Sequence, residues 1–230
     1  MLLSKSQHGF RIGKFTTTAL NELVKTISNN NAKKRWTLVV SLDLTKAFDL
    51  VNHRILLKKL EQLGIKGKAL QLIESYLSNR QKFVQVNNIF GSFKSKIKAS
   101  NIGVPQGGIL APLLFIIYVN CLEKIMKSLV SVEVTQYADD TTFCISGDSL
   151  EHVTLAYEEL MRVVTGFFAD IELVLKKDKT NLMLIGKELE LSRKILEKAG
   201  LKTVATIEFL GVHLDEKLNW SEHLVISPAN

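Results

Sequence analysis

The tetrapeptide Tyr137-Ala138-Asp139-Asp140 places two adjacent carboxylates between two apolar runs of the chain. The first run ends at Tyr137 and the second continues from Thr141 to Ile145, a pattern that predicts a hairpin with the aspartates at its tip. Asp is a preferred turn residue because its side chain hydrogen-bonds the nearby backbone, so a plain turn can also explain the pair. The two aspartates indicate a catalytic or metal-binding site only if other functional groups lie close to them.

A third carboxylate, Asp43, follows another apolar segment. Residues 36–44 are nearly all apolar or β-branched, which is typical of a strand buried on both faces. An ionised group at the end of such a strand must be paired or bound to metal. If the strands are neighbours, Asp43 and Asp139 converge, and such carboxylates can hold the ions of two-metal phosphoryl transfer. Mg²⁺ suits this site because it binds one or two carboxylates and leaves positions for water and phosphate.

A glycine-rich loop lies between these carboxylates in the sequence. Residues 103–108 (Gly-Val-Pro-Gln-Gly-Gly) run into an apolar helix with Pro112 in its first turn. Glycines let the backbone approach a ligand, and a helix N-terminus favours phosphate, although a tight turn without function has the same composition. Gln106 can cradle a nucleotide, Phe48 can lie under a bound sugar, and Lys179 can neutralise or protonate a leaving group.

A basic segment precedes the glycine-rich loop. Residues 81–86 and 92–99 predict the two arms of a hairpin. In the second arm, lysines alternate with other residues, so Lys94, Lys96 and Lys98 are expected on one face. They either protect a solvated edge strand from aggregation or follow nucleic-acid phosphates. The formal net charge of +7 and the pI near 9.3 favour a polyanionic partner.

The rest of the chain predicts one α+β domain. With 230 residues and 46% hydrophobic content it can bury a core, and no apolar run approaches the roughly 18 to 20 residues of a membrane span. Its two cysteines lie in apolar runs, which predicts reduced core thiols and excludes a disulfide framework or a cysteine-rich zinc site. The remaining expected elements are a helix after Thr16 to Thr18, a helix from Asn52 to Gly64, a helix over 68–77, a long helix capped by Asp148 with Glu151, a strand over 181–185 and a charged helix ending at Gly200.

Three motifs, in this order, resemble those of a reverse transcriptase: residues 41–49 (SLDLTKAFD), 103–112 (GVPQGGILAP) and 137–140 (YADD). The flanking residues 7–11 (QHGFR) and 209–215 (FLGVHLD) resemble those of non-LTR (LINE, Jockey-like) retrotransposons. The likeness covers essentially the whole chain. It implies an α+β polymerase palm, with a small antiparallel, ferredoxin-like sheet backed by helices, plus part of the fingers. The implied activity is that of an RNA-directed DNA polymerase, which adds deoxyribonucleotides to a primer 3′-OH.

The resemblance also implies a role for each matching residue. Asp43, Asp139 and Asp140 would bind two Mg²⁺ ions, with Mn²⁺ as an alternative, and Lys179 would stand near the pyrophosphate. The nucleotide would be contacted by Phe48, as a steric gate against a ribose 2′-OH, and by Gln106 and Gly107. The nucleic acid would be contacted by Arg11, by Lys94, Lys96 and Lys98, and by Gly211 in a primer grip over 209–214.

The implied domain division is a fingers remnant, about residues 1–36 and 55–100, and a palm, about 37–54 and 101–220. The implied partners are an RNA template, a DNA primer and deoxyribonucleoside triphosphates, with no membrane and with an endonuclease domain in the full-length parent. The expected localisation is intracellular, in the nucleus and cytoplasm as a ribonucleoprotein.

The chain departs from the family pattern in two ways. Lys176 stands where the family usually has Asn. The upstream basic fingers segment and a thumb after Trp220 are not expected within these residues, so extension by this chain is expected to be very slow or absent. Two hypotheses therefore remain, an RNA-directed DNA polymerase and a non-catalytic RNA-binding remnant of one, while Phe48 disfavours an RNA-templated RNA polymerase.

Overall fold

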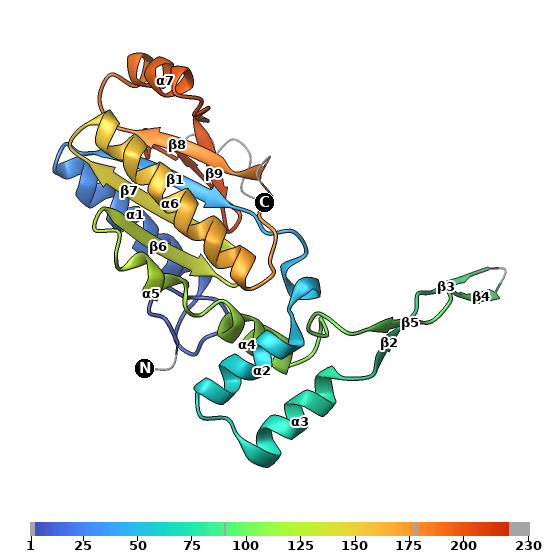
Figure 1. Cartoon of the computed structure of the whole chain (residues 1–230). Coiled ribbons are helices and arrows are strands. Elements are labelled where there is room, and N and C mark those ends of the chain that lie inside the picture. Colours follow the sequence, from blue (N-terminus) through green and yellow to red (C-terminus); the bar gives the residue numbers. More distant parts are fainter. Residues whose placement is uncertain (1–2, 90, 177–178, 221–230) are drawn as a thin grey trace.

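A four-stranded antiparallel sheet forms the centre of the molecule in the computed structural model, which describes residues 3–89, 91–176 and 179–220 (Figure 1). Its spatial order is β6-β7-β1-β8. Helices separate β1 from β6 and β7 from β8 in the chain, so the βαββαβ order gives the predicted ferredoxin-like topology. The strands are β1 (Trp36–Leu42), β6 (Val132–Tyr137), β7 (Asp140–Gly147) and β8 (Asn181–Ile185).

Helices cover the sheet, and three two-stranded ribbons complete the structure. The helices are α1 (Thr16–Ala32), η1 (Ala47–Leu50, a 3₁₀ turn), α2 (His53–Gln62), α3 (Gly67–Leu77), α4 (Leu110–Tyr118), α5 (Leu122–Met126), α6 (Leu150–Asp170) and α7 (Leu189–Lys198). The strands of the ribbons are β2 (Arg80–Lys82), β3 (Gln85–Asn88), β4 (Gly91–Lys94), β5 (Lys98–Ser100), β9 (Thr206–Phe209) and β10 (Val212–Asp215).

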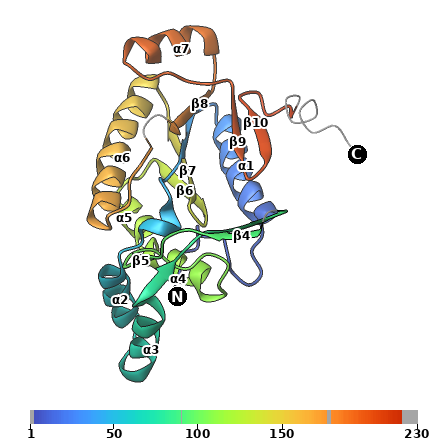
Figure 2. The same cartoon turned by 90° about the vertical axis from the view of Figure 1, so that its right-hand side faces the viewer.

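Both faces of β1 are buried, as its apolar sequence predicts. Leu38 and Val40 pack into a core shared with α4 and α6, whereas Val39 packs into a second core with α1 and the β9–β10 hairpin. Figure 2 shows α6 on one side of the sheet and α1 with β9–β10 on the other. Alternate residues of a strand point to opposite faces, so β1 serves both cores and is held firmly along its length. A firmly held strand is a good support for a catalytic group at its end.

The helix caps confirm one prediction and correct another. Asn52 caps α2, because its side-chain oxygen accepts a hydrogen bond from the Ile55 amide at 3.2 Å. The cap of α6 is Ser149, which accepts from the His152 amide at 3.1 Å, so the prediction of Asp148 as the cap was wrong. Asp148 instead pairs with Arg35 at 3.0 Å. Both residue types are good N-caps, and sequence alone does not separate neighbours.

The basic segment forms an arm that projects away from the sheet (Figure 1). The predicted second strand is interrupted, because β4 ends at Lys94 and β5 begins at Lys98. At the break the Ser95 amide donates to the Val84 carbonyl at 2.8 Å, and the Ser95 hydroxyl accepts from the Val84 amide at 2.9 Å. The arm is therefore two short ribbons, β2–β5 near the body and β3–β4 at the tip.

The two cysteines lie in different environments. Cys144 is a buried thiol as predicted, whereas Cys121 is exposed at the start of α5, so the prediction of a core thiol was wrong there.

Within the residues described, no helix is both long and apolar enough to cross a membrane.

Candidate active site

The register of the central strands brings the three predicted carboxylates to one end of the sheet. Leu42 of β1 lies opposite Thr141 of β7, so Asp43 follows level with Asp140. Tyr137 and Asp140 pair across the β6–β7 hairpin, which leaves Asp139 in its tight loop. The carboxylates therefore lie at the same end of the sheet, because β1 ends and β7 begins there.

The convergence of these carboxylates is electrostatically unfavourable. Desolvation raises the pKa of Asp140 to about 6, although its side chain still reaches solvent, and the charges of Asp139, Asp43 and Glu208 add to that rise. Burial also raises the pKa of Asp139, and the charge of Asp43 raises it further. Like-charged carboxylates disfavour each other's ionised form, and a cation between them relieves the repulsion. The site is therefore suited to a positively charged ligand.

Two lysines already stand at Asp43. The ammonium of Lys176 lies 3.0 Å from Asp43 Oδ2, and that of Lys179 lies 3.8 Å from the same oxygen. The backbone holds this arrangement, since the Lys176 amide donates to the Asp43 carbonyl at 3.0 Å. Lys177, which lies between these two lysines in the sequence, is outside the described residues. The structure thus places Lys179 at the site and adds Lys176, whose role its sequence position did not reveal.

A cavity of about 600 Å³ opens beside Asp139. Phe48, Gln106 and Gly107 line it with Asp139. Phe48 stacks on Phe115 of α4, with ring centroids 4.3 Å apart, so it is anchored in the core while its ring borders the cavity. The structure therefore brings together the predicted nucleotide-contacting residues and one of the carboxylates.

Gly103 sets the glycine-rich loop against the Phe48 segment. Its amide donates to the Val51 carbonyl at 2.8 Å, and the Val104 amide donates to the Phe48 carbonyl at the same distance. Gly103 has a φ of +83°, and a Cβ there would lie 2.6 Å from the Asp49 carbonyl oxygen. Only glycine fits this position, which explains how the loop comes so close to the site.

A second cavity, of about 430 Å³, lies on the other side of the carboxylates. Asp43 and Asp140 line it together with Lys179 and Gly211. Gly211 belongs to the two-residue turn between β9 and β10, where it and Leu210 have φ values of +81° and +53°. Positive φ at both positions is typical of a tight hairpin turn. The predicted primer-grip segment therefore lies next to the carboxylates.

Comparison with known proteins agrees with this arrangement. Residues 1–214 match the reverse transcriptase (RNA-dependent DNA polymerase) family. The chain belongs to this family. It is 26% identical over 235 residues to a probable RNA-directed DNA polymerase from transposon BS, and 25% identical over 228 residues to the RNA-directed DNA polymerase from mobile element jockey, both of Drosophila melanogaster. These alignments cover 97% and 96% of this chain and 25% and 24% of the relatives, so the chain spans about a quarter of their length.

Solved structures support the polymerase fold. An apo telomerase from Candida tropicalis, truncated from its C-terminal domain, superposes with a TM-score of 0.62 at 15% identity, over 94% of this chain and 40% of that one. Telomerase from Candida albicans gives a TM-score of 0.60 at 14% identity, over 92% and 34%. At such identities the likeness concerns the fold, and it fits a reverse transcriptase palm.

The carboxylates at this edge of the sheet are chemically suited to a divalent metal. Carboxylate oxygens are the hard ligands that Mg²⁺ prefers, and burial, with the charges of neighbouring carboxylates, raises the pKa of Asp139 and Asp140, so a cation beside them would stabilise their ionised forms. In the described part of the chain, however, no three carboxylate, imidazole or thiol groups gather closely enough to enclose an ion. Lys176 holds one oxygen of Asp43, so a metal at Asp43 must compete with this ammonium.

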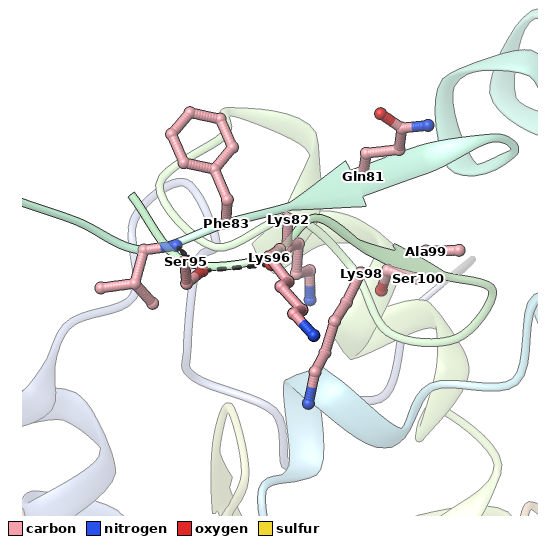
Figure 3. Close-up of a pocket in the computed structure, with 9 residues that line it drawn as sticks. Gln81, Lys82, Phe83, Ser95, Lys96, Lys98, Ala99 and Ser100 are labelled. Carbon is pink, nitrogen blue, oxygen red and sulfur yellow. Dashed lines mark hydrogen bonds between the residues drawn. The ribbon is translucent and has the colours of Figure 1, made fainter. Parts of the chain in front are cut away.

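The remaining predicted residues, Arg11 and the arm lysines, line neither of these two cavities. The Arg11 guanidinium donates to the backbone carbonyls of Ser4 and Gln7, the latter at 3.1 Å, and so braces its own loop. In the arm, Lys96 and Lys98 point to one side, and Phe83 points to the other (Figure 3). The Lys94 ammonium lies 5.4 Å from the Phe83 ring centroid.

The expectation of one face for all three lysines therefore holds for Lys96 and Lys98 and was wrong for Lys94. The break between β4 and β5 interrupts the alternation on which the expectation rested. Lys82 points to the same side as Lys96 and Lys98 (Figure 3). Lys82 was not among the predicted residues, although the alternation of side chains along a strand over residues 80–84 could have placed it on this face.

Proposed function

We propose that this chain is the palm, with part of the fingers, of an RNA-directed DNA polymerase that adds deoxyribonucleotides to a primer 3′-OH by two-metal phosphoryl transfer. The observation that carries the proposal is the β1–β7 register, which aligns Asp43 with Asp140 beside the Asp139 hairpin turn. The fingers would comprise about residues 1–36 and 55–100, and the palm about 37–54 and 101–220. The intact carboxylates favour this function over that of a non-catalytic RNA-binding remnant.

The metal would be held by Asp43 and Asp139, with Asp140 supporting the same site. Bound Mg²⁺ ions activate the primer hydroxyl and neutralise the charge on the transferred phosphate. Lys179 lies in the same cavity as Asp43 and Asp140 and would add positive charge near the leaving pyrophosphate.

The nucleotide would occupy the cavity beside Asp139. Phe48 borders this cavity and is held by its stacking on Phe115, so its ring is a fixed barrier beneath the sugar. The Gln106 amide donates to Asp49 at 3.4 Å, which orients it along the cavity wall. A fixed aromatic barrier would exclude a ribose 2′-OH and so select deoxyribonucleotides.

The arm would contact the RNA template or the template–primer duplex. No Asp or Glu occurs from residue 75 to residue 122, while Arg80, Lys82, Lys94, Lys96 and Lys98 lie in this stretch. Exposed basic side chains in a stretch of sequence without acidic residues are suited to phosphate contacts, whose affinity depends on charge placement.

A primer-extension assay tests the proposed function. The chain, in excess over an RNA template annealed to a DNA primer, is mixed with deoxyribonucleotides and Mg²⁺, and the products are resolved by length. We expect slow template-directed extension that stops when Mg²⁺ is chelated and that is much weaker with ribonucleotides alone. RNA binding without any nucleotide addition would overturn the polymerase proposal and favour the binding remnant.

A further inference from the structure

An N-terminal segment runs along the edge of β6 towards the catalytic hairpin. Gln7 forms a parallel bridge with Gln136, next to the end of β6. The Gln136 amide donates to the Ser6 carbonyl at 2.9 Å, and the His8 amide donates to the Gln136 carbonyl at 2.7 Å. This contact joins residues about 130 positions apart and leads the chain to the loop that carries Asp139.

The Gln7 side chain binds both backbone groups of Ala138. Its Oε1 accepts from the Ala138 amide at 2.9 Å and from the Gly9 amide at 2.8 Å, and its Nε2 donates to the Ala138 carbonyl at 3.3 Å. Gln7 is 2% exposed and Ala138 is 6% exposed, so no water layer substitutes for these bonds. A buried amide left without its partner would be costly.

Ala138 needs such support because its backbone is strained. It has a φ of +57°, a left-handed conformation that costs a residue with a Cβ roughly 1 to 2 kcal/mol. It also directly precedes Asp139, so its backbone angles set the direction in which Asp139 leaves the turn. The contact is close, since a Cβ at Gly9 would lie 2.4 Å from the Ala138 nitrogen.

The segment that carries Gln7 is itself anchored. The two ring nitrogens of His8 lie 2.8 Å from Thr18 Oγ1 and 2.9 Å from Glu22 Oε2, both on α1. The Arg11 guanidinium donates to the Gln7 carbonyl. Helix α1 in turn packs on the sheet, so the Gln7 amide is held against the hairpin by a rigid support.

We propose that Gln7 is a positioning residue, which fixes the strained backbone of Ala138 and thereby aims Asp139 at the cavity beside Phe48. The inference rests on the proposed polymerase function for its consequence, whereas the clamp on Ala138 can be measured without it. Gln7 touches no reacting atom, so its loss should slow the addition step more than it weakens nucleotide binding.

The test compares two buried glutamines on either side of the bridge. Gln7→Met removes the three hydrogen bonds while keeping the length of the side chain. Gln136→Met is the matched control, because Gln136 is 1% exposed and its Oε1 has no hydrogen-bond partner within the described residues. Gln7→Glu keeps an acceptor for the Ala138 and Gly9 amides and serves as the conservative variant. Amide hydrogen exchange is followed by NMR, and single-nucleotide addition is followed in single turnovers.

In Gln7→Met we expect exchange at the Ala138 amide to accelerate about tenfold or more, while the β1 amides keep their protection, which shows that the fold survives. The maximal addition rate should fall about tenfold to a hundredfold, as expected for a misplaced catalytic group, with little change in the nucleotide concentration for half-maximal rate. Gln7→Glu should recover the Ala138 protection, and Gln136→Met should match the unmodified chain.

Each contrary outcome has a definite meaning. Unchanged Ala138 exchange in Gln7→Met overturns the clamp, whatever the activity. Faster exchange with an unchanged addition rate overturns the positioning role. Loss of protection throughout β1 in Gln7→Met would mean a general loss of stability and would also overturn the positioning role. If the unmodified chain adds no nucleotide, the proposed function fails, and the exchange data alone judge whether Gln7 holds the hairpin turn.

Discussion

At the scale of single residues, Asp43 is shared between two possible partners. The Lys176 ammonium pairs with its Oδ2 in the structure, while the proposed reaction needs the same carboxylate for a metal. Partly exposed ion pairs of this kind contribute little stability, so the lysine can be displaced at modest cost. Among the described residues, lysine salt bridges reach only Asp43 of the three carboxylates, so a competing ammonium contacts Asp43 and neither Asp139 nor Asp140.

Replacing this lysine should therefore make metal binding easier. In Lys176→Asn the competing ammonium is lost and a neutral oxygen donor is introduced, so we expect a severalfold lower Mg²⁺ concentration for half-maximal primer extension. Lys194→Asn, on the surface of α7 far from the site, is the matched control and should leave the Mg²⁺ requirement unchanged. A Mg²⁺ titration of the extension rate measures both. An increased requirement in Lys176→Asn would show that the lysine assists the site.

The size of the Phe48 side chain should decide sugar selection. Phe48→Ala removes the ring that borders the cavity beside Asp139, so ribonucleotide incorporation should rise relative to deoxyribonucleotide incorporation by about tenfold or more. The stacking on Phe115 is lost as well, so a stability decrease of about 1 to 3 kcal/mol is expected. Single-nucleotide addition with each sugar measures the ratio. A loss of stability with an unchanged ratio would mean that Phe48 is only a core residue.

At the scale of elements, the glycine-rich loop depends on one close backbone contact. Gly103 and Gly107 have nearly equal φ values, +83° and +82°, but only Gly103 has atoms within 4 Å of an added Cβ. Gly103→Ala and Gly107→Ala therefore share the same backbone strain, and only the first adds a collision with Asp49. Comparing the two variants separates the cost of backbone strain from the cost of the collision with Asp49.

We expect Gly103→Ala to lower the free energy of unfolding by about 1 to 3 kcal/mol more than Gly107→Ala does. Urea unfolding of the two variants and the unmodified chain measures this difference. Equal losses in the two variants would show that the contact between Gly103 and the Asp49 carbonyl is not maintained in solution.

The arm should supply a salt-sensitive part of RNA binding. Replacing Lys94, Lys96 and Lys98 with Gln removes up to three phosphate contacts, and each contact contributes roughly 0.7 to the slope of log affinity against log salt for a single strand. We expect the slope to become shallower by about 1 to 2. Lys194, Lys198 and Lys202 are exposed lysines outside the arm, and the same change there is the control. Filter binding across a salt series gives both slopes, and equal slopes would exclude the arm from RNA binding.

Long regular elements could be predicted from the sequence, whereas local caps and contacts between distant residues could not. Strand β1 and helix α6 were predictable because their apolar patterns are long and regular. The cap at Ser149 and the break at 95–97 were missed, since adjacent cap formers compete and the Ser95–Val84 contact is irregular. Gln7 could not be assigned a partner because its contact with Ala138 spans 131 positions and depends on the assembled sheet.

At the scale of the whole molecule, one sheet edge collects functional groups from distant parts of the chain. The carboxylates come from the end of β1 and the β6–β7 hairpin; Asp139 lines the cavity that Phe48 borders, and Asp43 and Asp140 line the cavity that includes the β9–β10 turn. The two cores hold β1 from both faces and so fix the edge at which these groups meet. We propose that this edge is the catalytic centre of a reverse transcriptase.

The most direct test is primer extension on an RNA template by Asp43→Asn and Asp139→Asn variants. Each substitution removes one negative charge and one metal ligand while preserving side-chain size, so extension should fall by at least about a hundredfold while the unfolding transition is retained. Asp170→Asn, an exposed aspartate at the end of α6, should extend like the unmodified chain. Near-normal extension by either Asp43→Asn or Asp139→Asn would contradict the account.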